Sequence, residues 1–156
     1  MSAEHLSLLS NLGVGTLMCV VTVLTHFWGL LVLTHLMRLG RHHLRPHEGR
    51  RRQALVLLVV MLGIFALHTV EIWTYALAFY QLDEFASFEA ALYFSTSSFT
   101  TVGFGDLVMS PRWRMLSAIE SANGWILFGW STAFMLTVTT RLKLLEHEWL
   151  ESGDGA

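Results

Sequence analysis

Residues 100–106 read TTVGFGD, a short polar loop between two strongly apolar stretches of the chain. Unpaired peptide groups are costly in hydrocarbon, so a loop at membrane depth must face water, protein or an ion. Gly103 and Gly105 permit backbone angles that are closed to other residues. With alternating angles, the carbonyls of residues 101–104 can all point towards one axis, and the hydroxyl of Thr101 adds a further oxygen. Four such strands around an axis would replace the water around a dehydrated cation.

The composition is that of an integral membrane protein. The chain has 156 residues, of which 53% are hydrophobic and 14% charged, and its mean hydropathy is +0.50. Soluble domains carry about a quarter of charged residues. The net charge of −2 suggests no nucleic-acid partner. The single cysteine, Cys19, excludes a disulfide framework and a cysteine-based metal site.

Three segments are long enough to cross a bilayer, which takes about 20 apolar residues. They are residues 12–37, 54–82 and 113–140. Between the last two, residues 87–100 predict a helix with Ser87 as its N-cap, too short to span the membrane and too apolar for water. We therefore expect an all-α membrane protein with three transmembrane helices and one re-entrant helix followed by a loop.

Arginine and lysine residues predict the orientation. The linker at residues 38–52 contains six arginines, and Arg141 and Lys143 follow the last span, so eight of the ten basic residues flank one side. Basic residues mark the cytoplasmic side of a membrane. We expect a multi-pass protein of the cell (inner) membrane, with its N-terminus outside and its C-terminus in the cytoplasm. The linker also suits anionic lipid headgroups.

The loop resembles the signature filter of the potassium-channel family, usually written TVGYGD. The preceding YFSTSSF, residues 93–99, resembles the pore helix of that family. The resemblance divides the chain into an N-terminal part with the first span and linker (1–53), a pore domain (54–140) and a tail (141–156). Within the pore domain it implies an outer helix (54–82), a pore helix (87–100), a filter (101–106) and an inner helix (113–140). The layout is similar to small bacterial potassium channels with one extra N-terminal helix.

This resemblance implies passive conduction of potassium through a homotetramer, because each chain supplies one filter strand and the family needs four. Potassium is then the permeant ion, and no cofactor or enzymatic activity is implied. The implied ion-binding residues are Thr101, Val102, Gly103, Phe104 and Gly105, with K⁺ at the first four. Asp106 would lie at the outer mouth.

Phe104 departs from the family pattern, which usually has tyrosine at this place. In the family, that tyrosine hydroxyl often bonds aromatic residues of the pore helix. Its absence leaves open a weakly selective or nonselective cation channel of the same fold. We expect Phe104→Tyr to slow any spontaneous closure of the filter.

Two carboxylates lie inside expected spans, where charge is costly unless it is paired or faces water. Glu71 and Glu120 are both expected near the level of the pore helix, among hydroxyl groups that include Ser97 and Thr100. We expect the four residues to support the pore helix through hydrogen bonds. A gating proton sensor is the alternative role of the carboxylates.

Two glycines in the third span, Gly124 and Gly129, are candidates for a gating hinge. In the family, a glycine in the middle of the inner helix lets it bend, and the distance of Gly124 from Asp106 is close to that spacing. Close packing of helices through small residues is an equally good explanation.

Rival functions also use residues of the spans. An intramembrane metal site would use His26, His35, His68 and Glu71, although a histidine hydrogen-bonded to Glu71 is the simpler interpretation. A third possibility is a non-conducting regulatory subunit, against which the intact signature argues.

Overall fold

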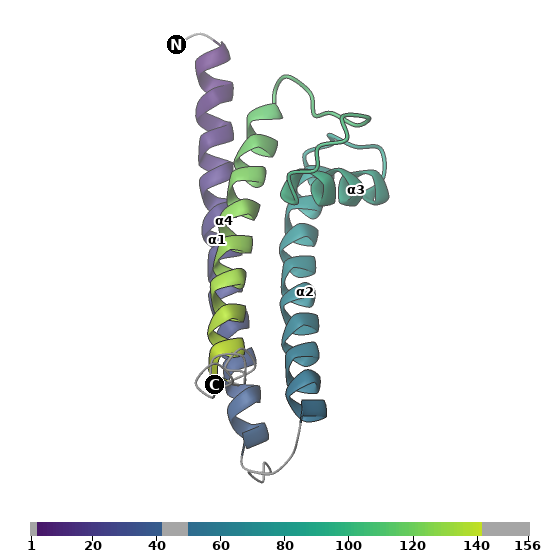
Figure 1. Cartoon of the computed structure of the whole chain (residues 1–156). Coiled ribbons are helices and arrows are strands. Elements are labelled where there is room, and N and C mark those ends of the chain that lie inside the picture. Colours follow the sequence, from purple (N-terminus) through teal and green to yellow (C-terminus); the bar gives the residue numbers. More distant parts are fainter. Residues whose placement is uncertain (1–2, 42–49, 142–156) are drawn as a thin grey trace, which may run out of the picture.

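The computed structural model describes residues 3–41 and 50–141, and this part of the chain is entirely helical apart from its connections. Its helices are α1 (Ala3–Arg41), α2 (Arg50–Gln81), α3 (Phe88–Phe99) and α4 (Arg114–Arg141). The three long helices run side by side, and the short α3 lies beside one end of α2, at a steep angle to it (Figure 1). The predicted all-α fold is confirmed.

Two of the described helices are long and apolar enough to cross a membrane: Leu8–Leu39 within α1 and Gln53–Gln81 within α2. Helix α4 has 28 residues but is less apolar, because Glu120 and Asn123 interrupt it. Both polar side chains are buried against other helices. At about 1.5 Å per residue, α1 is about 58 Å long and begins nine residues before the expected span at 12–37.

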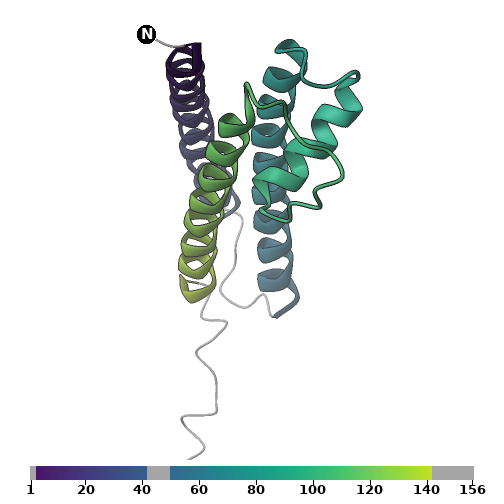
Figure 2. The same ribbon diagram turned by 90° about the horizontal axis from the view of Figure 1, so that it is seen from above.

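Helix α3 runs obliquely to α2, as a second view shows (Figure 2). Its first residue, Phe88, packs against Tyr80 near the end of α2, with ring centroids 6.2 Å apart. Its last residue, Phe99, packs against His68, with centroids 6.0 Å apart. The predicted N-cap is confirmed, because Ser87 Oγ accepts a hydrogen bond of 3.1 Å from the backbone N–H of Ala90. The helix thus enters the helical layer from one end and stops inside it.

Helix α1 packs against both α2 and α4. Glycines provide the close contacts, as is common between membrane helices. Gly15 lies against Ile119 of α4, and Gly29 lies against Leu67 of α2. Helix α1 therefore crosses from α4 near its start to α2 near its end.

The core is an aromatic cluster at the end of the molecule that contains α3. Phe99, Tyr75 and Phe79 are fully buried there, together with Leu116 and Leu127 of α4. Many large apolar side chains on the outer faces of α1 and α2 are exposed, for example Trp28 and Phe65. Exposed apolar surface of this extent suits lipid rather than water.

Candidate functional site: the signature loop and its supports

The signature loop (residues 101–106) turns back along the helix from which it emerges. The N–H of Gly103 donates to the carbonyl of Ser97 at 3.1 Å, and the N–H of Phe104 donates to Ser97 Oγ at 3.2 Å. Further along, the hydroxyl of Tyr93 donates to Asp106 Oδ2 at 2.9 Å. Successive residues of the loop thus pair with earlier and earlier residues of α3. This is the path of a re-entrant loop.

The backbone of the loop has positive φ at every second residue. The φ angles are +61° at Thr101, +58° at Gly103 and +79° at Gly105, while Val102 and Phe104 are not in this region. Alternation of this kind turns successive peptide carbonyls towards the same side of a strand. Thr101 carries the strain of a side chain at positive φ, and such strain is concentrated at functional sites.

The apolar side chains of the loop are not covered by the rest of the chain. Val102 is 55% exposed and Phe104 is 68% exposed. Phe104 stacks on Tyr93, with ring centroids 6.3 Å apart. A hollow of about 360 Å³ lies between these side chains and the face of α3 that carries Leu92 and Thr96.

Ser97 supports the loop directly, because its carbonyl and its hydroxyl each accept one N–H of the loop. Thr100, by contrast, turns its hydroxyl back to the carbonyl of Thr96 at 2.7 Å. Its bond is therefore local to the end of α3. The contact of Tyr93 with Asp106 was not anticipated, and it raises the pKa of the Tyr93 hydroxyl above its ordinary value.

Glu120 contacts α3 from α4. Its Oε1 lies 2.5 Å from Ser95 Oγ, and Ser95 Oγ in turn lies 2.9 Å from the carbonyl of Ile72. The serine has one hydrogen to donate, and the carbonyl of Ile72 can only accept. Both bonds form together when Glu120 is protonated and donates to Ser95. The second oxygen, Oε2, is buried without a partner among the described residues, which suits a neutral carboxyl group better than a charged one.

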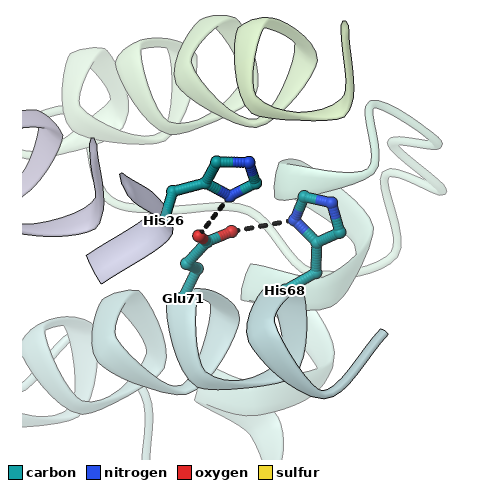
Figure 3. Close-up of side chains that lie close together, drawn as sticks. All are labelled: His26, His68 and Glu71. Atoms are coloured by element: carbon teal, nitrogen blue, oxygen red, sulfur yellow. Dashed lines mark hydrogen bonds and ion pairs between the residues drawn. The ribbon is translucent and has the colours of Figure 1, made fainter. Parts of the chain in front are cut away.

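Glu71 does not bond hydroxyls of α3, and the expectation that it supports that helix directly differs from the structure. Its Oε1 lies 2.8 Å from Nδ1 of His26, and its Oε2 lies 2.8 Å from Nδ1 of His68 (Figure 3). The candidate metal set had grouped His26 with Glu71, but periodicity within one helix could not predict a hydrogen bond between residues of two helices. His35 of the expected metal set is exposed, nine residues beyond His26 along α1. The structure thus brings three of the four residues together.

The two candidate hinge glycines have different surroundings. A Cβ added at Gly124 would lie 2.2 Å from the carbonyl oxygen of Phe99, the last residue of α3. A Cβ added at Gly129 would meet nothing within 4 Å. Gly124 therefore permits the close approach of α4 to the end of α3, whereas no contact within the described chain requires a glycine at 129.

Polar residues of α1 support the same region, and the sequence interpretation missed them. Asn11 donates from Nδ2 to the carbonyl of Arg112 at 2.6 Å and accepts from the N–H of Leu116 at 3.1 Å, so it caps the start of α4. Thr22 accepts from Asn123 Nδ2 at 2.7 Å. The recurrence of polar residues at 11, 22 and 26 along one buried face of α1 was the available signal.

Comparison with known proteins concerns the pore-domain part of the chain. A family model described as "Ion channel" matches residues 54–141, more than half of the chain. The match includes α2, α3, the signature loop and α4. No curated protein and no solved structure gave a match.

Proposed function

Because the chain belongs to the ion channel family, a family that conducts ions passively through a membrane, we propose that it is a potassium-selective channel. Potassium moves down its electrochemical gradient in single file and exchanges its water for oxygens of residues 101–105. The observation that carries this proposal is the signature loop itself. It doubles back along α3, and every second residue has positive φ.

The proposed ion path uses backbone oxygens, with no cofactor. The carbonyls of Thr101, Val102, Gly103 and Phe104 are the proposed K⁺ ligands, and Gly105 completes the strand. Carbonyl rings select ions by replacing their hydration shell. Asp106 lies at the outer mouth, where Tyr93 fixes its carboxylate. The negative end of the α3 dipole, at Phe99, favours a cation nearby.

The pore requires more than one chain, and we propose a homotetramer. One strand cannot enclose an ion, and the exposed Val102 and Phe104 side chains need a cover. The open hollow between the loop and α3 gives a neighbouring subunit a place to pack. Closed rings of identical subunits are a common solution for such incomplete sites.

In the proposed membrane arrangement, α1, α2 and α4 all span the bilayer of the cell. The start of α1 and the signature loop are at the outer face, and the end of α4 is in the cytoplasm. The polar residues of α4 face other helices and the pore, which makes its lower hydropathy compatible with a span. The linker at 38–52, proposed to contact anionic lipid, is described only at residues 38–41 and 50–52, and the tail at 141–156 only at Arg141.

Flux of potassium into liposomes that contain the purified protein tests the function. We expect a reversal potential that follows the potassium gradient when sodium is the competing ion. A reversal potential near zero under opposed potassium and sodium gradients would instead favour the nonselective channel raised by Phe104. An intact protein without flux of either ion would contradict both.

The substitution Gly103→Ala tests whether conduction depends on the backbone of the signature loop. A Cβ at this place meets nothing within 4 Å, so the substitution tests the positive φ of +58° alone. We expect loss of potassium flux or of selectivity. Gly13→Ala, in α1, also meets nothing within 4 Å, has no positive φ and leaves the flux unchanged.

A further inference from the structure

Four buried side chains from three helices form a closed ring of hydrogen bonds behind the end of α3. His26 comes from α1, His68 and Glu71 from α2, and Ser131 from α4. Each histidine Nδ1 lies 2.8 Å from one oxygen of Glu71 (Figure 3). Ser131 Oγ lies 3.0 Å from Nε2 of His68 and 3.4 Å from Nε2 of His26. No member of the ring is more than 6% exposed.

The number of hydrogens in this ring can be counted. An ionised Glu71 only accepts, so each histidine must carry its hydrogen on Nδ1. Both Nε2 atoms of neutral histidines would then be acceptors, and both face the single hydroxyl of Ser131. One hydroxyl can satisfy one of them. A further proton on either Nε2 completes the ring, because that N–H donates to Ser131 Oγ while the hydroxyl donates to the other histidine.

The net charge of the ring also favours one additional proton. Without the additional proton, one carboxylate and two neutral imidazoles leave a net charge of −1 at a fully buried place. With it, the ring is neutral. A buried charge without a partner is costly, and more so between membrane helices.

Among residues 3–41 and 50–141, no neighbouring group supplies the missing positive charge. On α1 the nearest titratable residue is Cys19, and on α2 it is Tyr75, which contact each other at 3.7 Å. On α4, Glu120 is held by Ser95, and α3 presents the ring of Phe99 to His68. The arginines of the described parts of α1 and α4 that follow the ring, Arg38 and Arg141, are twelve and ten residues along their helices, about 15–18 Å away.

We propose that this ring is a binding site for one proton, shared between His26 and His68, and that release of the proton reduces conduction. His68 links the ring to the signature loop, since its imidazole packs on Phe99, two residues before Thr101, and on Phe128 with centroids 4.5 Å apart. Release of the proton leaves a net charge of −1 in the ring and removes one hydrogen bond between a histidine and Ser131. The effect on conduction rests on the proposed channel function, whereas the binding of the proton does not.

The first experiment counts protons in the intact protein. Nitrogen-15 spectra of histidine side chains in lipid distinguish protonated from unprotonated ring nitrogens, and His26→Asn and His68→Asn identify the two signals. At neutral pH we expect three protonated nitrogens among the four of this pair. Two protonated nitrogens, with the hydrogen bonds to Glu71 intact, would overturn the proposal. This measurement needs no conduction, so its failure is distinct from failure of the channel function.

The second experiment uses Glu71→Gln, which closes the same ring without an additional proton. The amide group donates to one Nδ1, and its oxygen accepts from the other. The first histidine then donates from Nε2 to Ser131, whose hydroxyl donates to the second. Wild-type potassium flux should fall as pH rises, by at most about tenfold per pH unit when the four proton sites of a pore act independently. Glu71→Gln should remove that dependence.

His35→Asn is the matched control, because His35 is an exposed histidine of the same helix. It should keep the wild-type dependence on pH. Equal pH dependence in wild type and Glu71→Gln would overturn the role of the ring in conduction. The Tyr93–Asp106 bond does not supply an alternative at neutral pH, since the pKa of Tyr93 is raised above about 10.

A transition metal is the competing occupant of these residues, as three of their ligand atoms lie within 4.8 Å of one another. The separations of 2.8 Å between nitrogen and oxygen are those of hydrogen bonds. Ligands around a tetrahedral zinc at about 2.0–2.1 Å are farther apart. We therefore expect no stoichiometric zinc to remain after exposure to Zn²⁺ and desalting. Zinc retained by wild type and lost from His26→Asn would overturn the proton site.

Discussion

At the residue scale, Gly124 shows how one missing side chain fixes the relation between two helices. A Cβ added at Gly124 would clash with the carbonyl oxygen of Phe99. A backbone carbonyl at the end of α3 cannot move aside as a flexible side chain could. The position of α3, and with it the signature loop, therefore depends on a glycine in α4.

We expect Gly124→Ala to destabilise the folded protein by about 1–3 kcal/mol, the usual cost of forcing atoms into a packed site. Gly129→Ala meets open space and should be neutral or stabilising by up to about 1 kcal/mol, because alanine favours a helix. Denaturation of both variants in detergent, followed by tryptophan fluorescence, measures the difference. Equal stability of the two variants would contradict the packing role. A change in open probability of Gly129→Ala at unchanged stability would support the hinge at that residue.

The protonated state of Glu120 leads to a second prediction at this scale. Glutamine keeps a donor towards Ser95 and adds no charge, so Glu120→Gln should retain the stability and flux of wild type. Glu120→Ala removes the bond to Ser95 and leaves a cavity, and should cost about 2 kcal/mol or more. Infrared spectra provide a direct check, because the carbonyl band of a protonated acid should disappear in Glu120→Gln. A carboxylate band that disappears instead would show that Glu120 is ionised.

At the scale of elements, the sequence predicted what depends on local pattern. The bounds of α3 differ from the expected 87–100 by one residue at each end, because Ser87 is the N-cap and Thr100 the C-cap, after which Thr101 has a φ of +61°. The two glycines of the loop were also identified, because their freedom to adopt positive φ follows from residue type alone.

A histidine bonded to Glu71 was also predicted, and His68 three residues earlier in α2 is one such partner. The simultaneous bond to His26 was not predicted, since it depends on how α1 crosses α2. Apolar periodicity does not specify that rotation, and a polar residue in a span predicts a partner without naming it.

The function of α1 as a support of α4 is tested through Asn11. Its side chain satisfies the N–H of Leu116 and the carbonyl of Arg112 at once. Asn11→Ala leaves both without this partner and should cost about 0.5–2 kcal/mol, as for other helix caps. Leu12→Ala, at an exposed neighbouring place, is the control. Thermal stability in detergent should fall for Asn11→Ala alone, and an equal fall in both variants would reduce α1 to a nonspecific apolar contact.

At the scale of the whole molecule, one chain carries an incomplete site. The loop presents Val102 and Phe104 to the outside, and its carbonyls belong to a single strand. Glu120 Oε2 apart, the buried polar side chains of the described chain are paired, with groups of α1, α2 and α4 bonded to one another. Assembly therefore has to complete the pore, while the ring at Glu71 is already complete within one chain.

This separation predicts how mixtures of subunits behave. When wild type and Gly103→Ala are produced together in equal amounts and reconstituted, each pore draws four chains at random. If one strained loop is enough to stop conduction, the fraction of conducting pores is about one sixteenth, the fourth power of one half. Glu71→Gln mixed in the same way should instead change the pH dependence gradually, because each chain contains its own proton site. A flux that falls by only about half in the mixture with Gly103→Ala would indicate that each chain forms an independent pore, and would contradict the tetramer. The mass of the purified assembly gives the number of chains without reference to flux.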